Sequence, residues 1–334
     1  MCSGTIPRPL CNAVGEGAMR LRKLLLTVCG IVGALSLVMP AFAETTNNLG
    51  QGQAVVTILP AKNNVMPSNI QQNNLQAMVN GKESSIIGWT PFRGLNSDLE
   101  LAILIDDSAR ARIGLQFNDI IGFIQGLPTD AKVAVGYMNN GTAVLAGPLS
   151  SDHAKAIDAL RVPSGVIGGN ASPYFCLSDL AKHWPSKDRQ ARREVIMITD
   201  GVDNYYPGYD PNDPYLRAAI RDSIRAGLVV YSIYMPDRGQ VYSQYQSYIG
   251  QSLLTDVTST TGGYAYWDGS SRNPVSFRPY LNDIALRLQH QYQLRFEARL
   301  KGKPELQSMS LKVMDHKVEV FAPQRVNVSY PSAD

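Results

Sequence analysis

The sequence is poor in cysteine, with only four in 334 residues. Three of them (Cys2, Cys11 and Cys29) precede residue 44, so the rest of the chain keeps Cys176 alone. One thiol cannot close a disulfide within the chain, which excludes the disulfide-stapled frameworks of small secreted domains. A content of 44% hydrophobic residues is enough for a sizeable core instead. We expect Cys176 to be a buried apolar side chain rather than a reactive thiol.

Long apolar runs are also scarce, and the main one lies near the start of the chain. Residues 24–40 are apolar, the basic stretch 19–23 precedes them, and the small residues 41–43 follow. This order is typical of a secretory signal peptide. We predict a leader over residues 1–43, with the true start at Met19 and export to the periplasm or the cell exterior. The alternative is an uncleaved leader that anchors the chain in a membrane, although the run is short for a span.

An excess of one charge is missing once this leader is removed. The leader holds four of the 31 basic residues and one of the 28 acidic residues, which leaves 27 of each. Such a balance gives no support for binding to nucleic acid or to an anionic membrane surface. Catalytic signatures are missing as well. The sequence has no Walker loop, G-x-S-x-G elbow or G-x-G-x-x-G turn, and its four histidines lack zinc-ligand spacing.

The apolar pattern changes period along the chain. Residues 44–53 are polar and predict a flexible linker. Residues 54–95 contain two alternating runs around Asn80 and Gly81, a hairpin signal, and predict an N-terminal β segment. Residues 292–330 hold three further alternating strands. We predict that the two segments pair in a small flanking β-sandwich, because neither can bury a core alone.

Between these segments, strands alternate with helices over residues 99–291. The runs at 99–105 and 194–199 are apolar except at Glu100, Glu194 and Thr199, and such runs are typical of strands buried on both faces of a parallel sheet. Asn140 and Gly141 indicate one antiparallel hairpin. The pattern predicts an α/β domain with a doubly wound, mostly parallel sheet.

Polar side chains follow the strands of this sheet, where such folds bind ligands. They are Asp106, Asp107 and Ser108 after the first strand, Asp200 and Asp203 after a later one, and Asn170 and Ser172 in a loop between them. Two strand ends with carboxylates and a hydroxyl form an oxygen-rich set suited to Mg²⁺. The alternative is that these groups cap helices and fix loops.

The segments "ILIDDSAR", "GGN" and "VIMITDGVDN", in this order, resemble a von Willebrand factor type A (VWFA, or VWA) domain, and "TGGYAYW" is similar to its late strand. Together with the flanking segments, the chain resembles exported bacterial VWFA-related proteins over residues 54–325. The resemblance implies a Rossmann-like fold that mediates protein–protein interaction, often with a divalent cation. The family's metal site uses an Asp-x-Ser-x-Ser motif, a threonine and a later aspartate. The matching ligands here are Asp106, Ser108 and Asp200.

The chain departs from that pattern at two places. Arg110 stands where the second serine is expected, and the middle loop offers Asn170 or Ser172 instead of threonine. Because a guanidinium stays charged and can bind carboxylates, we hypothesise that Arg110 or Arg112 pairs with one of the site aspartates. The cation site is then weakened or lost. The alternative is that Arg110 faces solvent and a weakly bound Mg²⁺ remains.

The segment "NYYPGYDPNDPY" follows the later aspartate and is rich in tyrosine. Tyrosines are favoured contact residues in binding surfaces, so we predict that Tyr205, Tyr206 and Tyr209 contact a protein or glycan partner. A proline-stiffened loop that only packs on its neighbours is the alternative. The combined prediction is an exported, non-enzymatic binding or adhesion module. A structural component of the bacterial envelope is the second choice and a Mg²⁺-dependent hydrolase the third.

Overall fold

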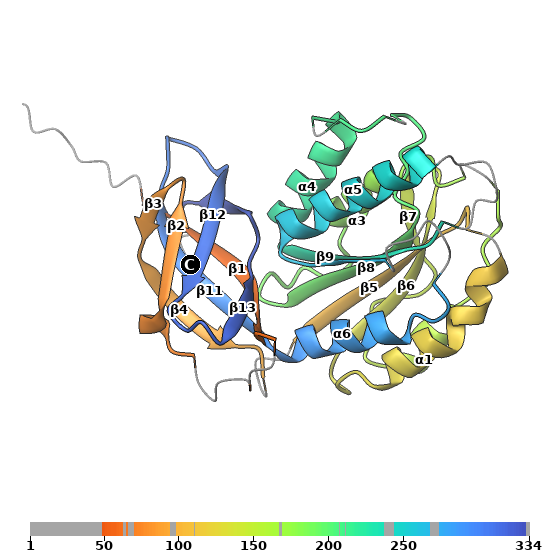
Figure 1. Ribbon diagram of the computed structural model, residues 1–334, viewed down its shortest axis with the longest axis horizontal. Helices are drawn as coiled ribbons and strands as arrows, with labels where there is room; N and C mark the ends of the chain where they lie inside the picture. Colours follow the sequence, from red (N-terminus) through yellow and green to blue (C-terminus); the bar gives the residue numbers. More distant parts are fainter. Residues whose placement is uncertain are drawn as a thin grey trace, which may run out of the picture. The chain divides into compact units, whose positions relative to one another are not determined.

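The computed structural model (Figure 1) describes residues 49–62, 65, 70–93, 98–109, 111–166, 169–206, 208–210, 212–236, 244–267 and 274–331. The contacts divide the chain into Met1–Thr45 and Thr46–Asp334, and all described residues lie in the second unit. The predicted leader and Arg110 therefore lie outside the described residues. Within them, no helix is long and apolar enough to cross a membrane.

A six-stranded sheet forms the centre of the α/β part. Its strands are β5 (Leu99–Asp106), β6 (Lys132–Asn139), β7 (Thr142–Leu145), β8 (Arg192–Thr199), β9 (Leu228–Tyr234) and β10 (Ala265–Tyr266). They lie in the order β10-β9-β8-β5-β6-β7, and all pairs are parallel except β6 with β7. Every residue of β5 and β8 is buried, as their apolar runs predicted. The hairpin turns at Asn140 and Gly141, which both have positive φ. The predicted mostly parallel sheet with one antiparallel hairpin is confirmed.

Helices cover both faces of this sheet (Figure 1). They are α1 (Phe117–Gln125), α2 (His153–Asp158), α3 (Pro173–Lys182), α4 (Pro214–Ala226), α5 (Gln244–Thr261) and α6 (Arg278–Gln289), and a 3-10 turn over Ala111–Gln116 precedes α1. On one face, Ile120 of α1 and Ile284 of α6 belong to the same apolar core. On the other face, Leu177 of α3 and Leu253 of α5 belong to a second core. Each face of the sheet therefore has its own apolar core.

A second, antiparallel sheet combines strands from both sides of the α/β part. Its strands are β1 (Leu49–Pro60), β2 (Leu75–Val79), β3 (Lys82–Ser84), β4 (Ile86–Pro91), β11 (Gln291–Arg299), β12 (Glu305–Val313), β13 (Val318–Phe321) and β14 (Arg325–Ser329). Early and late strands are intermixed in the order β3-β2-β12-β14-β1-β11-β4, and β13 also pairs with β1. The sheet curls around its own core, in which Val56 and Phe296 are fully buried. Neither set of strands forms this core alone.

The predicted flexible linker over residues 44–53 is wrong from residue 49 onward, because β1 already begins at Leu49. The glycines that suggested a turn lie inside this strand. A Cβ at Gly50 would collide with the side chain of Leu300, and one at Gly52 would collide with Phe296. These glycines therefore allow close packing within a strand rather than a bend of the chain.

Arg192 of β8 forms hydrogen bonds with both sides of the turn between α6 and β11. Its Nη1 donates to the carbonyl of Leu288 at 2.6 Å and to Oε1 of Gln291 at 2.8 Å, and its guanidinium lies 5.2 Å from the ring centre of Phe92. Glu194, two residues further along β8, is fully buried. Burial raises the pKa of Glu194 to about 8, although the charge of Arg192 opposes this shift.

Candidate functional site

The strands bring the predicted site residues to one edge of the α/β sheet. Parallel pairing sets Ile105 of β5 beside Ile198 of β8, so both strands end at the same level. Asp106 and Asp200 therefore emerge at adjacent strand ends, each almost fully buried. The loop before α3 supplies Asn170 to the same edge.

Asp106 is the centre of a hydrogen-bond network. Its Oδ1 accepts bonds from the backbone N–H and the hydroxyl of Ser108, at 2.9 and 2.5 Å. Its Oδ2 accepts bonds from Nδ2 of Asn170 at 2.8 Å and from the Thr199 hydroxyl at 2.7 Å. Four protein donors therefore face this one carboxylate. Thr199 was missed by the sequence reasoning, although its place as the last residue of a buried strand, just before Asp200, was a usable signal.

Asn170 is fixed by its neighbours on both sides. Its Oδ1 accepts a bond from Nδ2 of Asn204 at 3.0 Å, while its backbone carbonyl accepts one from the N–H of Gly141 at 2.9 Å. The next residue, Ala171, has a φ of 60°, a left-handed conformation that non-glycine residues adopt rarely. This loop is therefore held in one arrangement, which aims the Asn170 amide at Asp106.

Ser172 and Asp203 form a separate pair in the same edge. The Ser172 hydroxyl donates to Oδ2 of Asp203 at 2.6 Å and also caps the first turn of α3. The other carboxylate oxygen of Asp203 accepts the backbone N–H groups of Tyr205 and Tyr206. Burial raises the pKa of Asp203 despite these bonds. The pair therefore ties the tyrosine-rich loop to α3 and does not contact Asp106.

Asp107 finds its counter-charge in Arg161, a residue that the sequence reasoning did not consider. Arg161 Nη1 donates to Asp107 Oδ1 at 2.8 Å, and Asn139 Nδ2 donates to Oδ2 at 2.8 Å. The guanidinium also stacks on Tyr137, 3.8 Å from the ring centre. Burial raises the pKa of Asp107, but the bonds from Arg161 and Asn139 outweigh it and lower the pKa overall. No sequence motif links positions 107 and 161.

The hypothesised pairing of Arg110 stays a prediction, since Arg110 lies outside the described residues. Arg112 is exposed. Asp200 accepts the N–H of Val202 at 3.0 Å through Oδ1. Among the site aspartates, Asp107 has Arg161 as its cationic partner.

The predicted Mg²⁺ site at Asp106, Ser108 and Asp200 stays a prediction, and the donors around Asp106 bear on it. Among the described residues, no group of three or more His, Cys, Asp or Glu side chains is arranged to hold a metal ion. A hard cation requires oxygen lone pairs that face it. Here the Asn170 amide and the Thr199 hydroxyl point hydrogens at the carboxylate of Asp106, and the Ser108 hydroxyl is engaged with the same group.

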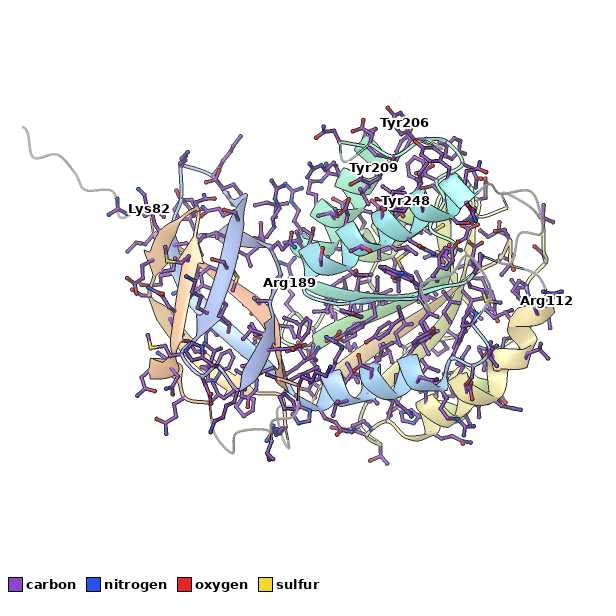
Figure 2. All side chains as sticks on the ribbon, in the orientation of Figure 1. Lys82, Arg112, Arg189, Tyr206, Tyr209 and Tyr248 are labelled. Carbon is purple, nitrogen blue, oxygen red and sulfur yellow. The ribbon has the colours of Figure 1, made fainter. Side chains whose placement is uncertain are left out.

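Five exposed tyrosines lie beside this edge, on the loop after β8 and on the first turns of α5. We call them the tyrosine face, and their exposed fractions lie between 40% and 67%: Tyr205, Tyr206, Tyr209, Tyr245 and Tyr248. Figure 2 shows Tyr206, Tyr209 and Tyr248 over the α4 and α5 side of the sheet. Tyr205 packs edge-on against Phe175 at 5.5 Å between ring centres and still exposes more than half of its surface. The three predicted partner-binding tyrosines are therefore anchored and accessible.

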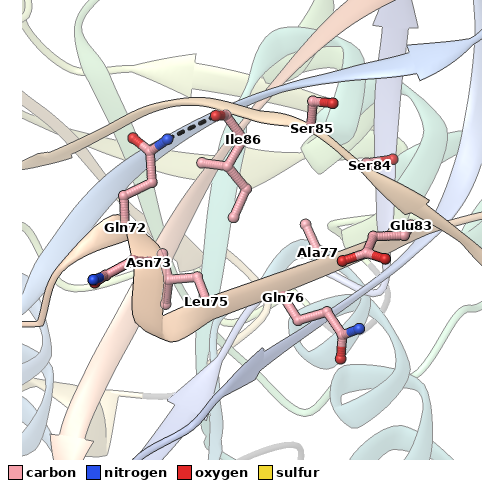
Figure 3. Close-up of a pocket in the computed structure, with 9 residues that line it drawn as sticks. All are labelled: Gln72, Asn73, Leu75, Gln76, Ala77, Glu83, Ser84, Ser85 and Ile86. Atoms are coloured by element: carbon pink, nitrogen blue, oxygen red, sulfur yellow. Dashed lines mark hydrogen bonds between the residues drawn. The ribbon is translucent and has the colours of Figure 1, made fainter.

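Two further features, a buried cysteine and a surface groove, add no candidate site. Cys176 is buried in the core between α3 and the sheet, as predicted, and burial raises the pKa of its thiol. A groove of about 660 Å³ lies on the antiparallel sheet, where Gln72 donates to the carbonyl of Ile86 at 2.7 Å (Figure 3). Glu83 is the only ionisable residue among those that line this groove.

The mostly parallel sheet with one antiparallel hairpin agrees with the sequence pattern and with the Rossmann-like fold that the resemblance implied. Residues 99–289 therefore form a VWA-like α/β domain. No family model matches the sequence, and no curated protein matches it either.

Several solved structures are similar over 57% of the chain. An aerotolerance-related membrane protein from Bacteroides fragilis is 15% identical, with a TM-score of 0.42 and 98% of that chain covered. The conserved hypothetical protein BatB from Bacteroides thetaiotaomicron is 18% identical, with a TM-score of 0.37 and 97% covered. The SpRpn10 VWA domain is 14% identical, with a TM-score of 0.38 and 97% covered. Likenesses this distant carry no information about a ligand or a partner.

Proposed function

We propose that this protein is an exported, non-enzymatic binding module that recognises a protein partner through the tyrosine face. The VWA-like domain presents that face, and the curled antiparallel sheet acts as a sandwich-like support. Binding does not depend on a divalent cation. A glycan ligand is the less favoured variant of the same proposal.

The exposure of the tyrosine face is the observation that carries the proposal. Tyrosine offers a large, rigid contact surface with a polar end, and it is enriched at protein interfaces. The contacts of Tyr205 with Phe175 and of Asp203 with the backbone of Tyr205 and Tyr206 hold the loop in place. A loop held in place before binding loses less conformational entropy when a partner docks.

The network around Asp106 supports cation independence. Four protein donors satisfy that carboxylate, so it needs no metal ion to balance its burial. The same bonds support a non-enzymatic role. The hydroxyls of Ser108 and Ser172 are buried and directed at carboxylates, and neither is placed to attack a substrate.

A structural role in the bacterial envelope is the second candidate. The observation that favours it is the second sheet, which has its own core and offers a further surface for assembly. Export itself is supported by the predicted leader.

The test is capture from a periplasmic extract by immobilised residues 44–334, with and without chelator. We expect one protein to be retained regardless of chelator, and to be lost in the triple variant Tyr205→Ala, Tyr206→Ala, Tyr209→Ala. Tyr330→Ala is the matched control, because Tyr330 is similarly exposed at 41% but lies after β14. Equal capture by the triple variant would refute the proposal, and chelator-sensitive capture would restore a cation-dependent adhesion site.

A further inference from the structure

We infer that the partner meets the tyrosine face with cationic side chains, as an arginine- or lysine-bearing protein segment whose charges lie against Asp210 and Asp256. The inference rests on the proposed function and specifies the chemistry of its partner.

Charge composition is the first argument. Residues 203–213, which carry Tyr205, Tyr206 and Tyr209, contain three aspartates and no lysine or arginine. Helix α5, which carries Tyr245 and Tyr248, contains Asp256 and no basic residue. The elements of the tyrosine face thus hold four carboxylates without a basic residue of their own, in a chain that is otherwise balanced in charge.

The placement of the two outer carboxylates is the second argument. The Tyr206 hydroxyl lies 3.4 Å from Oδ2 of Asp210, and the Tyr209 hydroxyl lies 3.5 Å from Oδ2 of Asp256. Each carboxylate therefore sits at the polar end of an exposed ring. A guanidinium or ammonium group can bind such a carboxylate while it rests on the face of the neighbouring ring.

Neither Asp210 nor Asp256 forms an ion pair within the described part of the chain. Burial raises the pKa of Asp256, and the nearby charge of Arg217 opposes this shift. The charge of Asp256 in turn raises the pKa of Tyr209. Arg217 itself is engaged with Oδ1 of Asn212 at 3.3 Å. The two carboxylates are therefore available to an external cation.

Two buried carboxylates of the same loop strengthen the preference for a cationic partner. Asp203 and Asp213 are fully buried, and their hydrogen-bond donors are a serine hydroxyl and backbone N–H groups rather than basic side chains. Neutral donors leave the negative charge in place, so the face attracts cations and repels acidic ligands. An acidic partner would need a bridging metal ion, which the arrangement around Asp106 does not favour.

The test uses three fluorescent peptides of equal length, in which arginine, glutamate or glutamine alternates with glycine. Fluorescence anisotropy follows their binding to residues 44–334 at low and high salt. We expect the arginine peptide alone to bind, and its affinity to fall with salt. The double variant Asp210→Asn, Asp256→Asn should weaken this binding at least roughly fivefold. Glu319→Gln removes an exposed carboxylate on β13 and should leave it unchanged.

Two results would overturn the inference: a glutamate peptide that binds as well as the arginine peptide, or arginine-peptide binding that survives the double substitution. The circular dichroism melting curve of each variant confirms that it is folded. If the inference fails while the tyrosine triple variant still loses its captured protein, the proposed function stands with a partner of different chemistry. If the triple variant captures the protein normally, the proposed function fails instead.

Discussion

The side-chain amide of Asn170 donates to Oδ2 of Asp106 across 2.8 Å. In the family pattern, a threonine that helps to hold the cation is expected in this loop. The amide places hydrogens where a metal ligand would place lone pairs. This hydrogen bond is one of the two departures from the family pattern, and the other is Arg110.

Substitution of Asn170 tests this relationship. Asn170→Thr removes the amide donor and, combined with Arg110→Ser, restores the family's ligand pattern. We expect the double variant to bind Mg²⁺ or Mn²⁺ more tightly than the original chain in isothermal titration. A micromolar dissociation constant in the original chain, abolished by Asp106→Ala, would show that the cation site was never lost. Asn170→Ala should cost about 1–3 kcal/mol of stability, because it removes one of the two donors to Oδ2 of Asp106 and the acceptor of the Asn204 amide.

Substitution of Arg161 should leave the carboxylate of Asp107 without its ion-pair partner. Arg161→Gln removes the ion pair and should lower the free energy of unfolding by about 1–2 kcal/mol at neutral pH, a figure discounted because half of the arginine side chain is exposed. The folded-state pKa of Asp107 lies below its unfolded value. Its contribution is therefore present above the unfolded pKa of about 3.9 and is lost as the pH falls through the folded pKa.

Urea unfolding from neutral to acidic pH measures this effect. The variant should lose less stability on acidification than the original chain. Lys155→Gln is the control, because Lys155 and Asp152 form an exposed pair at 3.8 Å, and it should change stability by less than about 0.5 kcal/mol. If Arg161→Gln and the original chain lost the same amount of stability on acidification, the stabilising role of the ion pair between Asp107 and Arg161 would be contradicted.

Glu194 should make the protein less stable as the pH rises. Its pKa is about 8 in the folded state, above the unfolded value of about 4.3. Between these values the folded state keeps a proton that the unfolded state has lost, so stability falls with increasing pH across that window and is constant below it. Glu194→Gln should flatten this decline and be more stable at pH 8, by an amount on the order of 2 kcal/mol. Parallel pH profiles for the variant and the original chain would refute the prediction.

Gly250 on α5 should tolerate no side chain. A Cβ there would overlap the backbone carbonyl of Asp200, so Gly250→Ala must push the helix away from the loop after β8. We expect a loss of about 2–4 kcal/mol in thermal or urea unfolding. Gly122→Ala on α1 is the control, since nothing lies within 4 Å of the added carbon, and it should be neutral or slightly stabilising. Equal effects of the two substitutions would show that the contact is unimportant.

The α/β part could be predicted because its signals are local. The apolar runs of β5 and β8 are longer than an exposed strand would allow, and Asn140 with Gly141 suits the positive φ values of a tight turn. The beginning of β1 could not be predicted. Gly50 and Gly52 have the composition of a loop, and only the packing of Leu300 and Phe296, distant in sequence, explains them.

The sequence predicted the site residues that follow the ends of strands. It did not predict contacts between residues that are distant in the sequence. Asp106, Ser108 and Asn170 do meet, as their positions indicated. Arg161 reaches Asp107 from a segment without a motif, because its place depends on how the chain returns after α2. The presence of an arginine at position 161 does not by itself indicate a contact with Asp107.

The pairing of β1 with β11 and β14 determines when the antiparallel sheet can form during synthesis of the chain. The first described strand finds its partners only after the α/β domain has been synthesised, about 240 residues later by the register of β1 with β11. Closing so long a loop is slow, since its entropy cost precedes any gain from the new contacts. Until then β1 is an unpaired edge strand, and that is the stage at which the chain most needs protection from aggregation.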